Sequence, residues 1–104
     1  MELDELTKKV NLVADNYAKK FKIKRDSDWY LIKTQEELGE LTQHYLMMTG
    51  RGRKKGLSDS EIREKFEMEV ADVLCMMLLL ASHHKIDLDR VVQKKWLNQL
   101  DRKS

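Results

Sequence analysis

The chain has 104 residues, of which 41% are hydrophobic and 37% are charged, and its formal net charge at pH 7 is +2. This length predicts a single domain over residues 1–104, and the near-balanced charge gives no argument for a nucleic-acid partner. The single cysteine, Cys75, excludes a disulfide within the chain. Residues 74–81 are apolar but too few to cross a bilayer, and we find no signal peptide, so we expect a cytoplasmic protein with no membrane partner.

The first half of the chain is predicted to form two helices. Hydrophobic residues recur at three- and four-residue steps between Leu3 and Phe21, which predicts an amphipathic helix over residues 2–21. A polar connection follows, and either Ser27 or Asp28 can cap a second helix. That helix is expected to reach about Thr49, before the helix-stopping Gly50.

The second half is predicted to form two more helices after a basic, glycine-bearing loop over residues 51–59. Ser58 and Glu61 have the spacing of a capping box, which starts a third helix ending at about His84. Asp87 is expected to cap a fourth helix that reaches about Asp101. Because no segment alternates with the period of a strand, the sequence predicts an all-α domain of four helices.

Five acidic residues on the second and third predicted helices suggest a metal site. At about 100° per residue, Glu36, Glu37 and Glu40 lie within one arc of about 100°, and Glu69 and Asp72 lie one turn apart. Glu69 and Asp72 interrupt an apolar segment, where two carboxylates ~4 Å apart repel by roughly 4 kcal/mol at an effective dielectric of about 20. A hard divalent cation held by oxygen ligands, Mg²⁺ or Mn²⁺, would relieve this repulsion.

Other interpretations of these acids remain open. Glu36, Glu37 and Glu40 could form a solvated helix face, and Glu69 with Asp72 could pair with Lys or Arg across a helix interface. A di-iron carboxylate site is excluded, because it needs Glu-x-x-His on two helices, whereas the third residue after Glu40 is Gln and the third after Glu69 is Asp.

The two acidic clusters also carry a family resemblance. Residues 36–40, EELGE, and residues 69–72, EVAD, resemble the EExxE…ExxD signature of the all-α nucleoside triphosphate pyrophosphohydrolases. That superfamily includes MazG-like enzymes, dimeric dUTPases and phosphoribosyl-ATP pyrophosphohydrolase. The resemblance covers roughly residues 25–102. It implies a four-helix bundle-like, MazG-type domain completed by dimerisation, which acts as a homodimer or homotetramer.

The resemblance also implies a reaction and roles for the five acids. The reaction is hydrolysis of a nucleoside triphosphate between its α- and β-phosphates, with release of a monophosphate and pyrophosphate. Glu37, Glu40, Glu69 and Asp72 would be ligands of Mg²⁺, with Mn²⁺ as a substitute. Glu36 would orient or deprotonate the attacking water.

Substrate-binding residues are expected on the second and last helices. Trp29 could stack on a nucleobase or serve as a hydrophobic staple or dimer contact. Lys33 could contact phosphate or pair with Glu37 one turn away. The family places Lys, Asn and a basic residue near the phosphates on its last helix. The corresponding residues here are Lys94 (or Lys95), Asn98 and Arg102, although the segment after Asn98 departs from the family's pattern, and these side chains could equally form a solvated charged face.

Two alternative functions remain. One is phosphoribosyl-ATP pyrophosphohydrolase, whose motif overlaps with this one. The other is a non-enzymatic helical interaction module, in which the basic loop RGRKKG, residues 51–56, and the last helix bind an acidic partner or nucleic acid. That loop contains no aromatic residue to stack on bases. Its composition is equally typical of a loop that is exposed to solvent and binds no partner.

Overall fold

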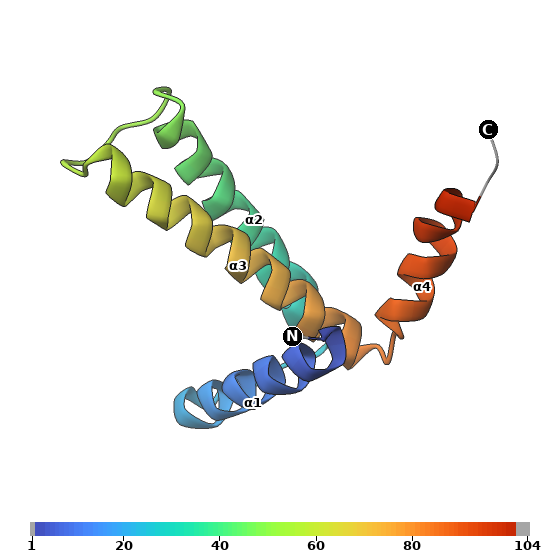
Figure 1. Ribbon diagram of the computed structural model, residues 1–104. Helices are drawn as coiled ribbons and strands as arrows, with labels where there is room; N and C mark the ends of the chain where they lie inside the picture. Colours follow the sequence, from blue (N-terminus) through green and yellow to red (C-terminus); the bar gives the residue numbers. More distant parts are fainter. Residues whose placement is uncertain (1, 102–104) are drawn as a thin grey trace.

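The structure is a computed structural model that describes residues 2–101. Within these residues it contains four α-helices, a final 3₁₀ helix and no strand, so the all-α prediction is confirmed (Figure 1). The elements are α1 (Leu3–Phe21), α2 (Ser27–Met48), α3 (Asp59–His83), α4 (Leu88–Lys95) and η1 (Leu97–Asp101). None of the described helices combines the length and apolar composition needed to span a membrane.

Two of the predicted N-terminal caps are confirmed and one is wrong. Ser58 and Glu61 form the capping box that starts α3, and the Asp87 carboxylate accepts a hydrogen bond from the backbone N–H of Arg90 at the start of α4. The cap of α2 is Asp26, whose carboxylate accepts from the backbone N–H of Trp29 at 2.8 Å. Ser27 lies inside the helix, and its hydroxyl instead contacts His83 Nε2 at 3.1 Å.

The fourth helix is shorter than the sequence predicts. It ends at Lys95, Trp96 follows as the C-cap residue, and the chain continues as η1. Figure 1 shows α4 and η1 extending away from the other helices. A short helix without tertiary packing is marginal in water, and the tighter 3₁₀ geometry is common where a helix frays.

The packed part of the molecule is formed by α1, α2 and α3. The antiparallel α2–α3 pair is a long hairpin, and α1 crosses it at the end where α2 begins and α3 finishes (Figure 1). There Tyr30 of α2 contacts Met76 and Leu79 of α3, with Val10 and Ala14 of α1 packed against them. The main cluster of buried residues therefore lies at one end of the hairpin, while Met47 and Ile62 are buried near its other end, where α2 and α3 have only each other as helical neighbours.

The structure predicts that the α2–α3 contact carries much of the stability of the chain. Ile62, on the first turn of α3, exposes only 1% of its surface. Replacing Ile62 with Ala is expected to lower the free energy of unfolding by about 2–5 kcal/mol, through lost burial and a residual cavity. The control Met68→Ala removes a side chain that is 59% exposed. It should change stability by less than about 0.5 kcal/mol in denaturant titrations at the same protein concentration. Equal losses in the two variants would contradict this view of the hairpin.

Candidate metal centre and adjoining cavity

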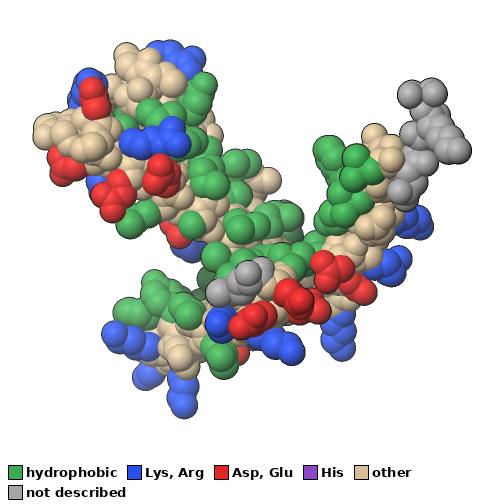
Figure 2. Space-filling model, viewed as in Figure 1, with side chains coloured by type: hydrophobic (Ala, Val, Ile, Leu, Met, Phe, Trp, Pro, Cys, Tyr) green, Lys and Arg blue, Asp and Glu red, His purple; other side chains and the backbone are tan. Residues whose placement is uncertain are grey.

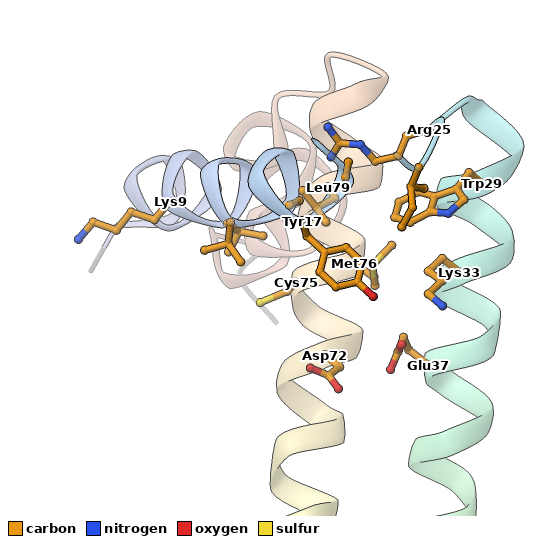
Figure 3. A pocket seen from close by; sticks show the side chains of 15 residues that line it. Lys9, Tyr17, Arg25, Trp29, Lys33, Glu37, Asp72, Cys75, Met76 and Leu79 are labelled. Carbon is orange, nitrogen blue, oxygen red and sulfur yellow. The ribbon is translucent and has the colours of Figure 1, made fainter. Parts of the chain in front are cut away.

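The packing of α2 against α3 brings three of the predicted metal ligands together. Carboxylate oxygens of Glu37, Glu40 and Glu69 all lie within 4.8 Å of one another. Glu37 and Glu69 are half-buried between the helices, whereas Glu40 is exposed beside them. Asp72 lies outside this group of three, but Figure 3 shows it on α3 across from Glu37 on α2. The three grouped residues are called the carboxylate cluster below.

Two oxygens of the carboxylate cluster are buried without a hydrogen-bond partner. They are Oε2 of Glu37 and Oε2 of Glu69. The ion pairs within residues 2–101 include none of the cluster's carboxylates and not Asp72 either, so the expected alternative of Lys or Arg partners across the interface is not observed there. A buried acceptor left unpaired costs about 1–3 kcal/mol, and more when it is charged. A proton or a cation is therefore favoured at this point.

The ionisation of the cluster reflects this shortage of positive charge. Burial raises the pKa of Glu37 to about 7, and the negative charges of Glu40, Asp72 and Glu69 add to this rise. The pKa of Glu69 is also raised, first by burial and then by Glu40 and Asp72. Both shifts follow from placing several carboxylates in a partly dry interface. Near neutral pH the cluster holds a proton that a divalent cation could replace.

The donor set fits a hard divalent cation. Three carboxylates from two helices offer oxygen ligands only. Two of their oxygens have no hydrogen-bond partner that would compete with a cation. Mg²⁺ is usually bound by a few carboxylates and completes its octahedron with waters and substrate phosphates. The exposed side of Glu40 leaves room for such additional ligands.

His44 is a neighbour of the cluster to which the sequence assigned no role. Its Nδ1 lies 2.8 Å from the backbone carbonyl oxygen of Glu40, which holds the ring one turn along α2. A positive charge on the His44 ring lowers the pKa of Glu69, and this offsets part of the rise caused by burial and by the other carboxylates. The available signal was its i,i+4 spacing from Glu40, which places both side chains on one face of a helix.

Beside the cluster lies an open cavity of about 570 Å³, bounded by α1, α2 and α3 (Figure 3). Its wall is mostly apolar, and Val10, Val13 and Met76 contribute to it. Glu37 and Asp72 lie at one end of the cavity, with Lys33 between them and Trp29. A cavity of this size, apolar along its length and charged at one end, has the general form of a small-molecule site.

Aromatic and cationic side chains also line the cavity. Trp29 lines it while packing edge-on against Tyr30, with ring centroids 5.1 Å apart, so it also contributes to the core. Arg25 lines the end near Trp29; it pairs with Asp15, and its Nη1 is buried without a hydrogen-bond partner. Tyr17 lines the cavity from α1. The sequence did not single out Tyr17 or Arg25, because one falls on an ordinary amphipathic stripe and the other in a polar connection.

Lys33 and Glu36 pair with each other. Lys33 Nζ lies 3.2 Å from a Glu36 carboxylate oxygen, so the partner is three residues away and the expected pair with Glu37 is wrong. The hydrogen bond to Glu36 raises the pKa of Lys33, with smaller contributions from the charges of Glu36 and Glu37. Lys33 therefore remains a cation at the charged end of the cavity, beside the candidate water-activating residue.

The predicted residues of the last helix are not brought to the cluster within one chain. Lys94 and Lys95 end α4, and Asn98 belongs to η1, so the expected single helical face is interrupted at Trp96. All three are exposed on the segment that extends away from the hairpin (Figure 1). Arg102 lies outside the described residues.

Comparison of the chain with protein-family models, with curated proteins and with solved structures gives no match.

The raised pKa of Glu37 predicts a pH dependence of stability in the absence of divalent ions. The folded chain holds a proton that the unfolded chain releases near the ordinary carboxyl pKa of 4.5. Between this value and about 7 the folded state binds more protons, so the free energy of unfolding should fall as the pH rises through this window and level off above it. In Glu37→Gln the fall should be smaller, because only the Glu69 contribution remains.

Denaturant titrations in a chelator from pH 5 to pH 8 would measure this effect, taking ~pH 4.5 and ~pH 7 as its limits. Glu36→Gln is the matched control, since Glu36 precedes Glu37 and pairs with Lys33 instead of joining the cluster. It should retain the wild-type fall in stability. A wild-type stability that rises across this window would contradict the proposed ionisation of the cluster.

Proposed function

We propose that this protein is a Mg²⁺-dependent nucleoside triphosphate pyrophosphohydrolase that cleaves between the α- and β-phosphates. The observation that carries the proposal is the pair of buried oxygens on Glu37 and Glu69, which have no hydrogen-bond partner, with Glu37 also lining the charged end of an apolar cavity. The EExxE…ExxD resemblance supports the same reaction, because its residues supply this cluster.

The chain's acids divide into cation-holding and water-orienting roles. Glu37, Glu40 and Glu69 would hold Mg²⁺, with Mn²⁺ as a substitute, and Asp72 would complete the set from α3. When bound, the ion neutralises phosphate charge and lowers the pKa of a coordinated water. Glu36 would accept a proton from the attacking water, provided that its carboxylate comes within about 2.6–3.2 Å of that water. The ion pair with Lys33 restricts where the Glu36 carboxylate can lie.

The cavity would receive the nucleoside part of the substrate. Trp29 and Tyr17 offer aromatic surface to a base, and Lys33 offers positive charge between this surface and the carboxylates. With the base near Trp29, the phosphates would extend toward Glu37 and Asp72. Base, sugar and phosphates would then follow one another along the cavity toward the carboxylates.

Phosphate contacts from Lys94, Lys95 and Asn98 would require a second copy of the chain. In one copy these residues lie on the extended C-terminal segment, away from the cluster. A homodimer or homotetramer is therefore part of the proposal, and the α4 segment of a neighbouring copy would supply any phosphate clamp.

The interaction-module alternative gains less support from the structure. In the basic loop, Arg51 lies 5.6 Å above the ring of Tyr45 and Lys54 pairs with Asp59 at 3.0 Å. Two of its four cations are thus already in local contacts. The loop also contributes nothing to the cavity.

A substrate panel tests the reaction directly. Canonical ribo- and deoxyribonucleoside triphosphates and phosphoribosyl-ATP would each be incubated with Mg²⁺, and the monophosphate and pyrophosphate products quantified. Glu69→Gln should reduce the rate on the order of 100-fold, because the buried ligand oxygen loses its charge. The matched control is Glu67→Gln on the same helix, where Glu67 is exposed and paired with Arg63 at 2.9 Å. It should keep wild-type activity.

Three outcomes of this panel would contradict the proposal in different ways. Release of orthophosphate would show that another bond is cleaved. Activity confined to phosphoribosyl-ATP would favour the alternative enzyme, and no hydrolysis of any compound would favour the interaction module.

Metal binding should also be visible in thermal melting. A ligand that binds only the folded state at about 100 times its Kd stabilises it by about 2.7 kcal/mol. Saturating Mg²⁺ or Mn²⁺ should therefore raise the Tm of the wild type, and more at pH 8 than at pH 6, because Glu37 with a pKa of about 7 must first lose its proton. The double variant Glu37→Gln/Glu69→Gln should lose the shift, whereas Glu67→Gln should retain it. An equal rise in Tm in the double variant would show that the ion binds at another site.

A further inference from the structure

The end of α1 and its connection to α2 carry a local concentration of positive charge. Although the net charge of the whole chain is only +2, residues 16–25, NYAKKFKIKR, contain five basic side chains and no acidic one. One of the five, Arg25, pairs with Asp15. The other four are exposed lysines that form no ion pair within residues 2–101: Lys19, Lys20, Lys22 and Lys24.

Two aromatic rings lie among these lysines. Tyr17 and Phe21 are one turn apart on α1, their ring centroids are 4.6 Å apart, and they expose 56% and 54% of their surfaces. Lys20 Nζ lies 5.4 Å from the centroid of the Phe21 ring. Figure 2 shows Lys and Arg side chains along the outer side of α1, with hydrophobic side chains beside them toward the hairpin. The two rings and the four lysines are called the basic-aromatic surface below.

Helix capping accounts for only part of this arrangement. Lys22 is the C-cap residue, with a left-handed φ of 55°, and its backbone N–H donates to the carbonyl oxygen of Ala18. The partial negative charge at the end of a helix stabilises lysines in its last turn, as it does for Lys19 and Lys20. Capping requires neither Lys24, which lies beyond the helix, nor two aromatic rings left half-exposed.

The neighbouring acids are engaged elsewhere. Asp15 pairs with Arg25, and the carboxylate of Asp26 caps α2. Asp28 lies in the first turn of α2, at the positive end of that helix. Within residues 2–101 the four lysines therefore keep their charge without a carboxylate partner, and an external polyanion is favoured at this point.

We propose that the basic-aromatic surface binds single-stranded nucleic acid, with phosphates on the four lysines and unpaired bases on Tyr17 and Phe21. Proteins hold single strands without sequence preference by combining a positive track for the backbone with aromatic rings on which bases stack. The contact uses neither the carboxylate cluster nor a cation bound there. It therefore goes beyond the proposed function and does not depend on it.

The shape of the molecule favours a strand over an anionic membrane. Tyr17 points from α1 toward α3 and lines the cavity near Met76 (Figure 3). A flat bilayer cannot enter the angle that α1 makes with the hairpin, whereas a flexible strand can (Figure 1). Membrane-surface helices also turn a broad apolar face outward, but Val10 and Ala14 of α1 pack against the core.

Fluorescence anisotropy of a labelled single strand tests the proposal. A strand of about 12 nucleotides is long enough to cover such a site. It should lack a 5′-triphosphate and be measured in a chelator, so that it does not bind as a substrate of the carboxylate cluster. Contacts from all four lysines predict that log affinity falls against log salt concentration with a slope of about −3, at about −0.7 per neutralised phosphate.

Two variants separate the charge from the stacking. Lys19→Gln/Lys20→Gln alters exposed side chains only and should halve the salt slope, to about −1.5. Phe21→Ala removes a ring and no charge, so it should weaken strand binding on the order of tenfold and leave the salt slope unchanged. Because bases in a duplex are already stacked on each other, Phe21→Ala should bind a duplex with the wild-type Kd. Far-UV circular dichroism checks that each variant keeps the helical content of the wild type.

The matched control is Arg53→Gln/Lys55→Gln, which removes two exposed cations from the basic loop. That loop joins the far ends of α2 and α3, away from α1 (Figure 1). The control should keep the wild-type Kd and salt slope for the strand.

Any of three results would overturn the proposal. One is the absence of strand binding at low salt. Another is a salt slope that falls in the loop variant and stays at the wild-type value in Lys19→Gln/Lys20→Gln, which would place the strand on the basic loop. The third is binding to vesicles that contain phosphatidylserine without binding to the strand, which would make the surface a membrane contact. If Phe21→Ala does not fold, the comparison of the two charge variants still decides the outcome.

Discussion

The antiparallel contact between α2 and α3 is the constraint on which the rest of the structure depends. It places Glu37 and Glu40 of α2 beside Glu69 of α3 and leaves two of their oxygens buried without partners. The same contact provides the two walls on which α1 completes the cavity. Burial in this partly dry interface, and after it the charge of the neighbouring carboxylates, raises the pKa of Glu37 and Glu69, so the cluster does not stabilise the hairpin.

This arrangement divides the hairpin into parts with different physical roles. Near α1, apolar side chains such as Tyr30, Met76 and Leu79 pack closely and supply stability. In the middle, the carboxylate cluster weakens the interface and offers ligands to a cation. Stability and the proposed chemistry therefore draw on different segments of the same two helices, and the cavity joins them. A cation in the cluster would couple the two by offsetting the repulsion that the core otherwise has to outweigh.

The predictions from sequence succeeded where a single helix decides the outcome and failed where neighbours decide it. The capping box at Ser58 and the cap at Asp87 follow from short local spacing. The predicted cap of α2 was wrong, because Asp26, Ser27 and Asp28 are all good cap residues. Asp26 caps the helix, and Ser27 instead contacts His83 on α3. The fourth helix was expected to be continuous, but within residues 2–101 α1, α2 and α3 do not pack extensively against it, so little sustains its geometry beyond Lys95.

The sequence by itself determined the four helices and placed Glu37, Glu40 and Glu69 on two of them, because helix formation and the direction of each side chain depend on local periodicity. Only the tertiary structure decided that these three carboxylates share a site, that Lys33 pairs with Glu36, and that Tyr17 and Arg25 border the cavity. It also separated Lys94 and Asn98 from the cluster of their own chain. These outcomes depend on crossing angles, burial and the direction of α4, which are set by contacts between residues far apart in the sequence.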